Sequence, residues 1–218
     1  MIRVFCMDVR GRDFLDASWA PYLSEERKEA ARRRRLPEAR QMCLGAEALL
    51  NRALEAVGAG IPLPAAYTRN EYGKPYLSPE SGIYVNWSHS GAYAVCAVSD
   101  TEVGVDIQEM DKEPGERLAR RILVPEEYRD REETACGERK ERFYRYWTVK
   151  ESFLKMKGTG FYGDLDVFRV ALGTGAADIL DAEGNHLCLA RFLPFKEAGY
   201  LVCVCREGVW QAPDVEYI

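Results

Sequence analysis

The stretch that most constrains this chain of 218 residues is 143–158, where aromatic and aliphatic side chains are mixed with charged ones over several turns before a glycine. This spacing predicts an amphipathic helix that ends at the glycine. At 3.6 residues per turn, Trp147, Glu151 and Lys155 share one stripe, and Lys150 lies at its edge. The pattern therefore places one carboxylate and two amines beside the apolar face of a helix.

Taken alone, this stripe fits a surface helix with an ordinary i,i+4 Glu–Lys pair. Two other stretches favour a functional site. Residues 103–108 predict a buried strand interrupted by Asp106, and a carboxylate among valine and isoleucine needs a partner such as a metal ion. Residues 84–91 combine amide, hydroxyl and imidazole donors, with Ser88 and His89 among them, which suits phosphate oxygens better than a packed core.

In order and spacing, these motifs resemble the Sfp-type 4′-phosphopantetheinyl transferases. The resemblance rests on a Gly-Lys-Pro turn at 73–75, an Asn-x-Ser-His-Ser turn at 86–90, a Gly-Val-Asp-Ile strand at 104–107 and a Trp-x-x-Lys-Glu-x-x-x-Lys helix at 147–155. Each motif is weak by itself, but together they span roughly residues 72 to 158. The resemblance implies an α+β fold of two similar α/β halves in a pseudo-twofold arrangement.

The division implied is an N-terminal half at 1–105, on the coenzyme A adenine and 3′-phosphate side, and a C-terminal half at 106–218 with the metal-binding strand and the catalytic helix. Hydrophobic periodicity agrees with strands and helices in both halves. The first half has a predicted strand at 2–9, a helix beginning after Ser24 and a long helix at 38–57. The second half has predicted strands at 165–172, 177–181, 187–193 and 199–205.

The activity implied by the resemblance is magnesium-dependent transfer of 4′-phosphopantetheine from coenzyme A to a serine of an apo acyl or peptidyl carrier protein, a holo-carrier synthase reaction that also yields 3′,5′-ADP. Asp106 and Glu151 are the expected Mg²⁺ ligands. Lys155, with Lys150 as a second candidate, would neutralise the oxygens of the transferred phosphoryl group. Either Glu151 or a metal-bound water or hydroxide could take the serine proton, and the sequence leaves this open.

Many members of the family carry a second acid at the position that Gln108 occupies here. The amide oxygen of Gln108 can bind magnesium directly or through water, but it brings no charge. Glu109 is one residue further and should point to the other face of a regular strand, so we do not expect it to replace that acid.

A coenzyme A site follows from the same resemblance. Lys74 and Pro75 are expected to hold the adenine, with Ser88 and His89 nearer the phosphates. Phe161 and Tyr162 lie in a glycine-punctuated loop after the helix. Basic residues of the region 24–40 are expected to contact the 3′-phosphate, by position Arg27, Lys28 and Arg40.

A basic stripe on a predicted helix is formed by Arg117, Arg120 and Arg121. It is either a solvated helix face or a dock for an acidic helix of a carrier protein. The run of four arginines at 32–35 suggests nucleic-acid binding, but the net charge of −5 and the lack of interleaved aromatics argue against it. A basic-helix nucleic-acid binder centred on 27–40 is therefore the weakest alternative.

No run approaches the roughly 20 apolar residues of a membrane span, and seven scattered cysteines without a Cys-x-x-Cys pair favour reduced core thiols. We expect a cytoplasmic protein without a membrane or nucleic-acid partner, and a monomer, as family members of this length typically are. The main alternative to the transferase is a non-catalytic module that binds coenzyme A or a carrier protein, for which Gln108 is the best sequence support.

Overall fold

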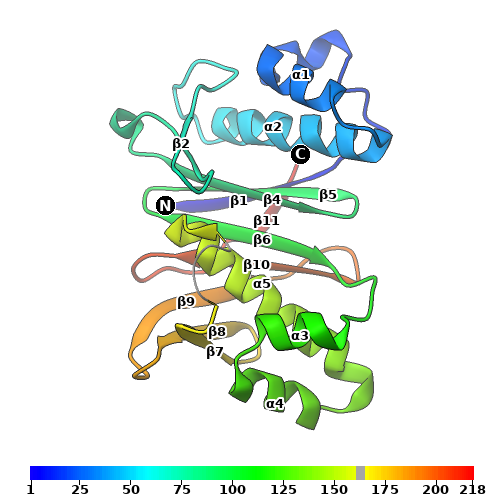
Figure 1. The fold of residues 1–218 in the computed structure, drawn as a ribbon. Coiled ribbons are helices and arrows are strands. Elements are labelled where there is room, and N and C mark those ends of the chain that lie inside the picture. The colour runs from blue at the N-terminus through cyan, green and yellow to red at the C-terminus, as the bar shows by residue number, and fades with distance from the viewer. Residues whose placement is uncertain (161–164) are drawn as a thin grey trace.

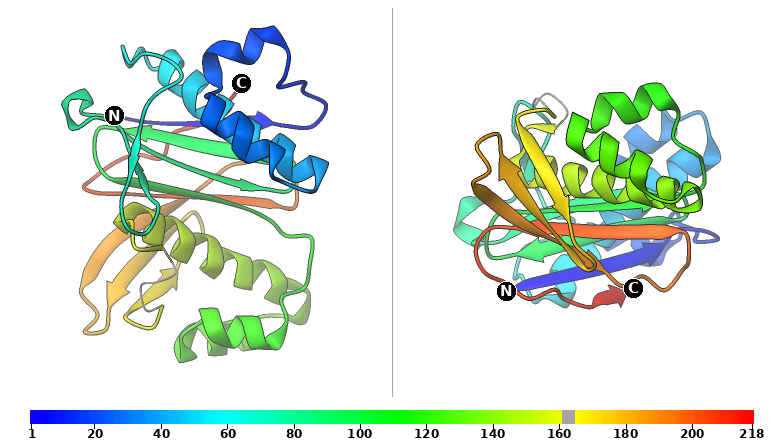
Figure 2. Two further views of the ribbon diagram at one scale, coloured as in Figure 1. Left: turned by 45° about the horizontal axis from the view of Figure 1, so that its top comes forward. Right: turned by 90° about the horizontal axis from the view of Figure 1, so that it is seen from below.

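The computed structural model describes residues 1–160 and 165–218, which form a mixed α+β fold built on two sheets (Figures 1 and 2). The four-stranded sheet has the order β11-β1-β5-β4 and is antiparallel apart from the parallel pair β1–β11. Its strands are β1 Ile2–Asp8, β4 Tyr84–Ser90, β5 Tyr93–Ser99 and β11 Val215–Tyr217. A separate two-stranded ribbon pairs β2 Thr68–Arg69 with β3 Pro75–Tyr76.

One helix covers this first sheet, and a second, shorter helix packs against the first. Helix α1, Glu25–Arg32, begins where the Ser24 hydroxyl accepts a hydrogen bond from the backbone of Arg27, and α2, Pro37–Ala56, begins at a proline. Alanine and leucine side chains of α2 pack against β1, β4 and β5 in one apolar core. Short 3₁₀ helices lie at η1 Ala17–Tyr22 and η2 Pro79–Ser81.

The second sheet is antiparallel and has the order β6-β10-β9-β8-β7. Helix α5 crosses it, and α3 and α4 lie at the beginning of that helix (Figure 1). The elements are β6 Val103–Glu109, α3 Glu116–Ile122, α4 Pro125–Glu133, η3 Cys136–Glu138, α5 Arg139–Lys157, β7 Phe168–Leu172, β8 Ala176–Asp181, β9 His186–Leu193 and β10 Tyr200–Arg206.

The two sheets meet where β4 lies beside β6, and side chains rather than a backbone ladder join these strands. The Asn86 amide oxygen accepts a hydrogen bond from the backbone N–H of Val105 at 3.0 Å, and the Ser90 hydroxyl accepts one from Glu109 at 2.9 Å. The predicted boundary at 105/106 falls inside β6, which pairs along its whole length with β10.

The predicted elements agree with these bounds to within a few residues, but no sequence pattern predicted α4 or β11. The central helix was also expected to have one apolar face. That expectation is wrong, because α5 is buried on several sides, with Thr148, Lys150 and Ser152 among its inaccessible residues. The loop residues Phe161 and Tyr162 lie outside the described residues. Among residues 1–160 and 165–218, no helix is both long and apolar enough to cross a membrane.

Candidate active site

A glycine on β6 determines how closely helix α5 can approach the sheet. A Cβ atom at Gly104 would collide with the carbonyl oxygen of Ser152 and the backbone nitrogen of Met156. Because glycine has no side chain, α5 lies directly on β6 at this point. The same contact brings Glu151 and Lys155, on the neighbouring turns, beside Asp106, two residues further along the strand.

Asp106 is 1% exposed and is surrounded by donors from three elements. The Lys155 amine lies 2.5 Å from its Oδ1, and the Ser88 hydroxyl donates to the same oxygen at 2.7 Å. Lys155 also donates to Ser88 at 2.8 Å, so the three side chains form a closed triangle across the β4–β6 junction. Gln108 donates its amide to Oδ2 at 2.9 Å. The buried carboxylate is thus paired and hydrogen-bonded, as its burial requires.

Glu151 is the exception in this group. No hydrogen bond or ion pair joins its carboxylate to another side chain in residues 1–160 or 165–218. Burial raises the pKa of Glu151 to about 7, and the negative charge of Asp106 acts in the same direction, against the opposing effect of Lys155. A half-buried acid next to a second carboxylate has the electrostatic surroundings of a cation ligand.

The donor set fits magnesium. Mg²⁺ is usually held by one or two carboxylates together with substrate phosphates and waters, and Asp106 and Glu151 supply that number. The described residues contain no cluster of three or more His, Cys, Asp or Glu that could hold a metal by themselves. A cation here would therefore need oxygens from a ligand, with the Gln108 amide as a neutral addition.

Lys150 does not join this group. Its amine forms a buried ion pair with Glu127 at 2.8 Å, donates to the carbonyl oxygen of Leu165 at 3.1 Å and lies 5.1 Å from the centre of the Phe168 ring. Burial lowers the pKa of Lys150, while the Glu127 carboxylate opposes that shift. No sequence pattern pointed to Glu127, which lies on the unpredicted helix α4.

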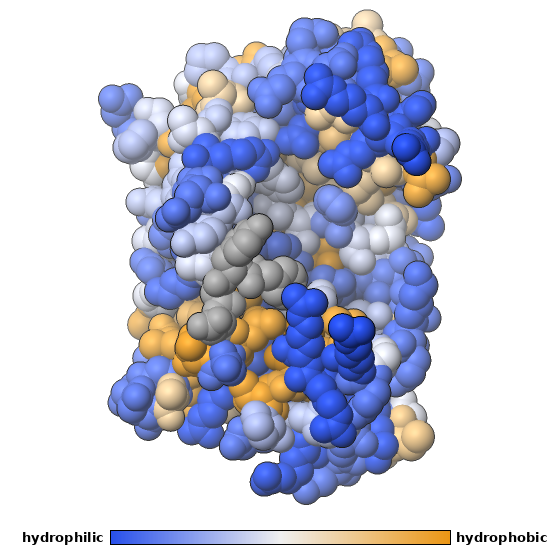
Figure 3. Space-filling model, viewed as in Figure 1, coloured by the Kyte–Doolittle hydropathy of each residue, from blue (hydrophilic) through white to orange (hydrophobic). Residues whose placement is uncertain are grey.

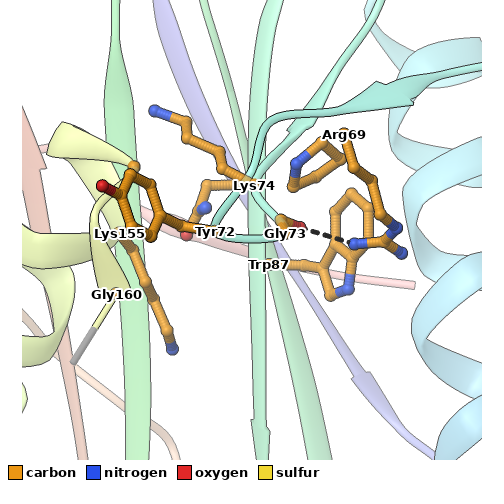
Figure 4. A pocket seen from close by; sticks show the side chains of 10 residues that line it. Arg69, Tyr72, Gly73, Lys74, Trp87, Lys155 and Gly160 are labelled. Atoms are coloured by element: carbon orange, nitrogen blue, oxygen red, sulfur yellow. Dashed lines mark hydrogen bonds between the residues drawn. The ribbon is translucent and has the colours of Figure 1, made fainter. Parts of the chain in front are cut away.

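A cavity of about 210 Å³ adjoins the Asp106 group at the Gly-Lys-Pro turn. The predicted residues Lys74 and Pro75 line it together with Lys155, and the Trp87 ring and Tyr72, which sequence reasoning did not select, also face it. Figure 4 shows Arg69 and Trp87 on one side of the turn and Tyr72 and Lys155 on the other. An aromatic wall beside a lysine suits a planar base joined to phosphates.

Of the phosphate-site candidates on β4, Ser88 lies in the Asp106 triangle and His89 follows it. Desolvation lowers the pKa of His89, and the positive charges of Lys155 and Arg34 act in the same direction. Arg34 belongs to the run of four arginines at 32–35. The structure thus brings an unpredicted arginine near His89.

The three basic residues expected at the 3′-phosphate have protein partners. Arg27 contacts Glu47 at 3.5 Å and donates to the Tyr67 hydroxyl at 2.8 Å. Lys28 pairs with Glu25 at 2.7 Å, and Arg40 donates to the backbone of Arg34 at 2.7 Å. None of the three contacts the Asp106 group in the described residues.

Glu109 accepts a hydrogen bond from the Tyr200 hydroxyl at 2.7 Å and lines a separate cleft of about 870 Å³. Its side chain thus lies on the other side of the strand from Gln108, as the alternation along a strand requires. Arg117, Arg120 and Arg121 are exposed on α3, where Arg120 pairs with Glu116 at 2.7 Å.

Residues 102–205 match the family model of the 4′-phosphopantetheinyl transferase superfamily. A 4′-phosphopantetheinyl transferase of Bacillus subtilis is 32% identical over 192 residues, which are 87% of this chain and 84% of the relative. The transferase psf-1 of Bacillus pumilus is 30% identical over 91% of this chain and 84% of its own. The transferase Sfp of Bacillus subtilis strain 168 is 31% identical over 64% of this chain and 62% of its own length. This chain therefore belongs to the 4′-phosphopantetheinyl transferase family.

Proposed function

We propose that this protein transfers the 4′-phosphopantetheine group of coenzyme A to a serine of an apo acyl or peptidyl carrier protein. The relatives are named for this transferase activity, and they are similar over most of the chain. The observation that carries the proposal is the Glu151 carboxylate, which is unpaired within residues 1–160 and 165–218, beside the Asp106–Ser88–Lys155 triangle and a cavity that suits a nucleotide base.

The reaction joins the serine oxygen to the β-phosphorus of coenzyme A and breaks the bond from that phosphorus to the oxygen bridging it to 3′,5′-ADP. Lys155 would donate to the pyrophosphate oxygens and neutralise their charge, which is the main task in phosphoryl transfer. Its present partners, Ser88 and Asp106, hold the amine at the β4–β6 junction. Ser88 and His89 would position the phosphates from β4.

Asp106 and Glu151 would hold Mg²⁺, with the Gln108 amide beside them. The ion, when bound, supplies charge neutralisation for the pyrophosphate. Glu151 would also be a candidate for the base that accepts the serine proton, because no protein donor occupies its carboxylate within residues 1–160 and 165–218. The alternative base would be a water at the same site.

Arg117 and Arg121 would dock the carrier protein. Both are exposed on α3, and Leu118 between them is 39% exposed. On the face in Figure 3, hydrophobic residues gather over the lower half of the molecule, with hydrophilic side chains beside them. A basic, partly apolar surface complements an acidic amphipathic helix.

Three further features complete the proposal. The two sheet-and-helix units would be related by a pseudo-twofold axis through the β4–β6 junction. The seven cysteines are all free thiols, which suits a reducing compartment such as the cytoplasm. Lys74 and Pro75 would border the adenine through the turn that lines the 210 Å³ cavity.

The test is a mass spectrum of an apo carrier protein after incubation with this protein, coenzyme A and Mg²⁺. We expect a gain of one phosphopantetheine, about 340 Da from the formula of the group, that is lost with a chelator and with Asp106→Asn or Glu151→Gln. Gln41→Ala, remote from the Asp106 group, serves as the control variant. Tight coenzyme A binding without any mass gain on carriers of several pathways would instead indicate the non-catalytic binding module.

A further inference from the structure

The side chain of Lys74 does not point into the cavity that its turn lines. It is 7% exposed, its amine forms an ion pair with Glu102, and it donates to the carbonyl oxygen of Met156 at 2.6 Å. The amine also lies 5.3 Å from the centre of the Tyr76 ring. Figure 4 shows the side chain extending away from Trp87. The amine is therefore held by three groups of the protein itself, Glu102, Met156 and Tyr76.

Asn70 makes a second connection between the turn and α5. Its side-chain oxygen accepts hydrogen bonds from the backbone of Tyr72 at 3.1 Å and of Lys74 at 2.8 Å, which fixes the turn. Its side-chain nitrogen donates to the carbonyl oxygen of Gly158 at 2.8 Å. The carbonyls at the end of a helix lack partners within the helix, and Asn70 and Lys74 satisfy two of them.

The contact between the turn and the end of α5 is close. A Cβ atom at Gly158 would lie 2.9 Å from Cδ of Lys74 and 3.1 Å from the amide nitrogen of Asn70. Lys155 lies one turn before Gly158 and lines the same cavity. The Gly-Lys-Pro turn, which would border the adenine, is thus fixed to the last turn of α5, which carries Lys155.

We propose that Lys74, Glu102 and Asn70 are positioning residues that clamp the Gly-Lys-Pro turn to the end of α5, so that the two ends of coenzyme A are bound at a fixed spacing. The inference rests on the proposed coenzyme A site. A ligand that binds through two ends gains affinity from both only when the two subsites are held at a matching distance. Loosening the clamp lowers the affinity for the whole of coenzyme A, while the affinity of each subsite for its own part of the ligand stays nearly unchanged.

Glu102 distinguishes a clamp from a direct contact. If the Lys74 amine bound coenzyme A itself, Glu102→Gln would release the amine toward the phosphates, and coenzyme A binding would stay constant or become tighter. In the clamp, Lys74→Met and Glu102→Gln break the same connection. Each variant weakens the binding of coenzyme A, and the double variant loses no more affinity than either single variant.

The experiment is isothermal titration calorimetry of coenzyme A and of inorganic pyrophosphate against the wild type, Lys74→Met, Glu102→Gln and the double variant. We expect the Kd of coenzyme A to rise about tenfold in all three variants, with a change of less than about twofold for pyrophosphate. Lys112→Met, at a lysine whose side chain is 84% exposed, is the control and should match the wild type.

Asn70→Ala gives an independent test, because it breaks the second connection without leaving a buried charge. This variant should give the same pattern, with a higher Kd for coenzyme A and an almost unchanged Kd for pyrophosphate. Wild-type coenzyme A affinity in Glu102→Gln, or a parallel loss of pyrophosphate affinity, would overturn the clamp. Failure of the wild type to bind coenzyme A would instead overturn the proposed function, and the clamp with it.

Discussion

At the scale of single residues, the site combines a carboxylate with three hydrogen-bond donors and one that lacks a partner among the described residues 1–160 and 165–218. Asp106 receives hydrogen bonds from Lys155, Ser88 and Gln108, and its negative charge, together with burial, raises the pKa of Glu151 to about 7. Burial is the larger cause of this shift, and the positive charge of Lys155, which pairs with Asp106, opposes it.

This pKa predicts how the stability of the cation-free protein depends on pH. Between about pH 4.5 and 7 the folded protein keeps a proton on Glu151 that the unfolded chain releases, so the free energy of unfolding falls as the pH rises. Glu151→Gln lacks this titration. We expect the variant to gain stability relative to the wild type by on the order of 1 to 3 kcal/mol between pH 4.5 and 8. Urea unfolding in a chelator measures the difference, and a pH-independent gap would contradict the assignment.

At the scale of elements, the position of α5 on β6 depends on Gly104. An alanine there forces its methyl group into the backbone at Ser152 and Met156, and backbone atoms cannot move aside as a flexible side chain can. We expect Gly104→Ala to lower the free energy of unfolding by about 3 kcal/mol and to reduce phosphopantetheine transfer at least tenfold. Gly137→Ala is the matched control, since a Cβ atom there meets nothing within 4 Å. Equal stability of the two variants would show that the close approach is not needed.

The same helix is held on its other side by the buried pair Lys150–Glu127. Glu127 also accepts hydrogen bonds from the backbone of Val124 at 3.1 Å and of Val170 at 2.8 Å, so this pair joins α4, α5 and β7. Lys150 therefore anchors α5 to α4 and β7.

Removing one member of this pair leaves the other charge buried. We expect Lys150→Met to cost about 3 to 5 kcal/mol of unfolding free energy, and the double variant Lys150→Met/Glu127→Leu to cost less than the sum of the single changes. Equilibrium urea unfolding of the four proteins gives the coupling energy. Additive losses would mean that the ion pair contributes nothing beyond its separate contacts.

At the scale of the whole molecule, the site lies where the two sheets meet, so it exists only when both are folded. The polar residues Asn86, Ser88 and Ser90 on one face of β4 bridge to β6, where a continuous sheet would have had backbone hydrogen bonds. The basic side chains of α3 are on the second unit, whereas the Gly-Lys-Pro turn is on the first. Coenzyme A and the carrier protein would thus approach from different units.

The exposed arginines of α3 predict electrostatic steering of an acidic carrier protein. We expect the double variant Arg117→Glu/Arg121→Glu to lower kcat/KM for the carrier about tenfold at low salt, with less effect at high salt, because screening weakens steering. The KM of coenzyme A should not change. Arg52→Glu on α2, 40% exposed and in the other unit, is the control. An equal loss in both variants would indicate a general effect of net charge.

Most residues that the structure brings together around Asp106 were selected from the sequence. Asp106, Glu151, Lys155 and Ser88 belong to local patterns, because a charged or polar residue in a strand or on a helix stripe is visible in the order of residues, whereas Gln108 was selected from the family resemblance. The structure places Ser88, Gln108 and Lys155 in hydrogen-bond contact with Asp106. The long helix α2 and the strands of the second sheet were likewise predicted from periodicity. The comparisons with known transferases confirm the family that the motifs indicated.

Only the tertiary structure decided what each charged side chain faces. Lys150 and Glu151 are neighbours in sequence, yet 100° of helix rotation directs one to Glu127 and the other to Asp106. Lys74 was expected at the adenine, but its amine is held by Glu102 and the end of α5, two segments remote in sequence. Such pairs depend on contacts between distant parts of the chain, and local spacing carries no information about them.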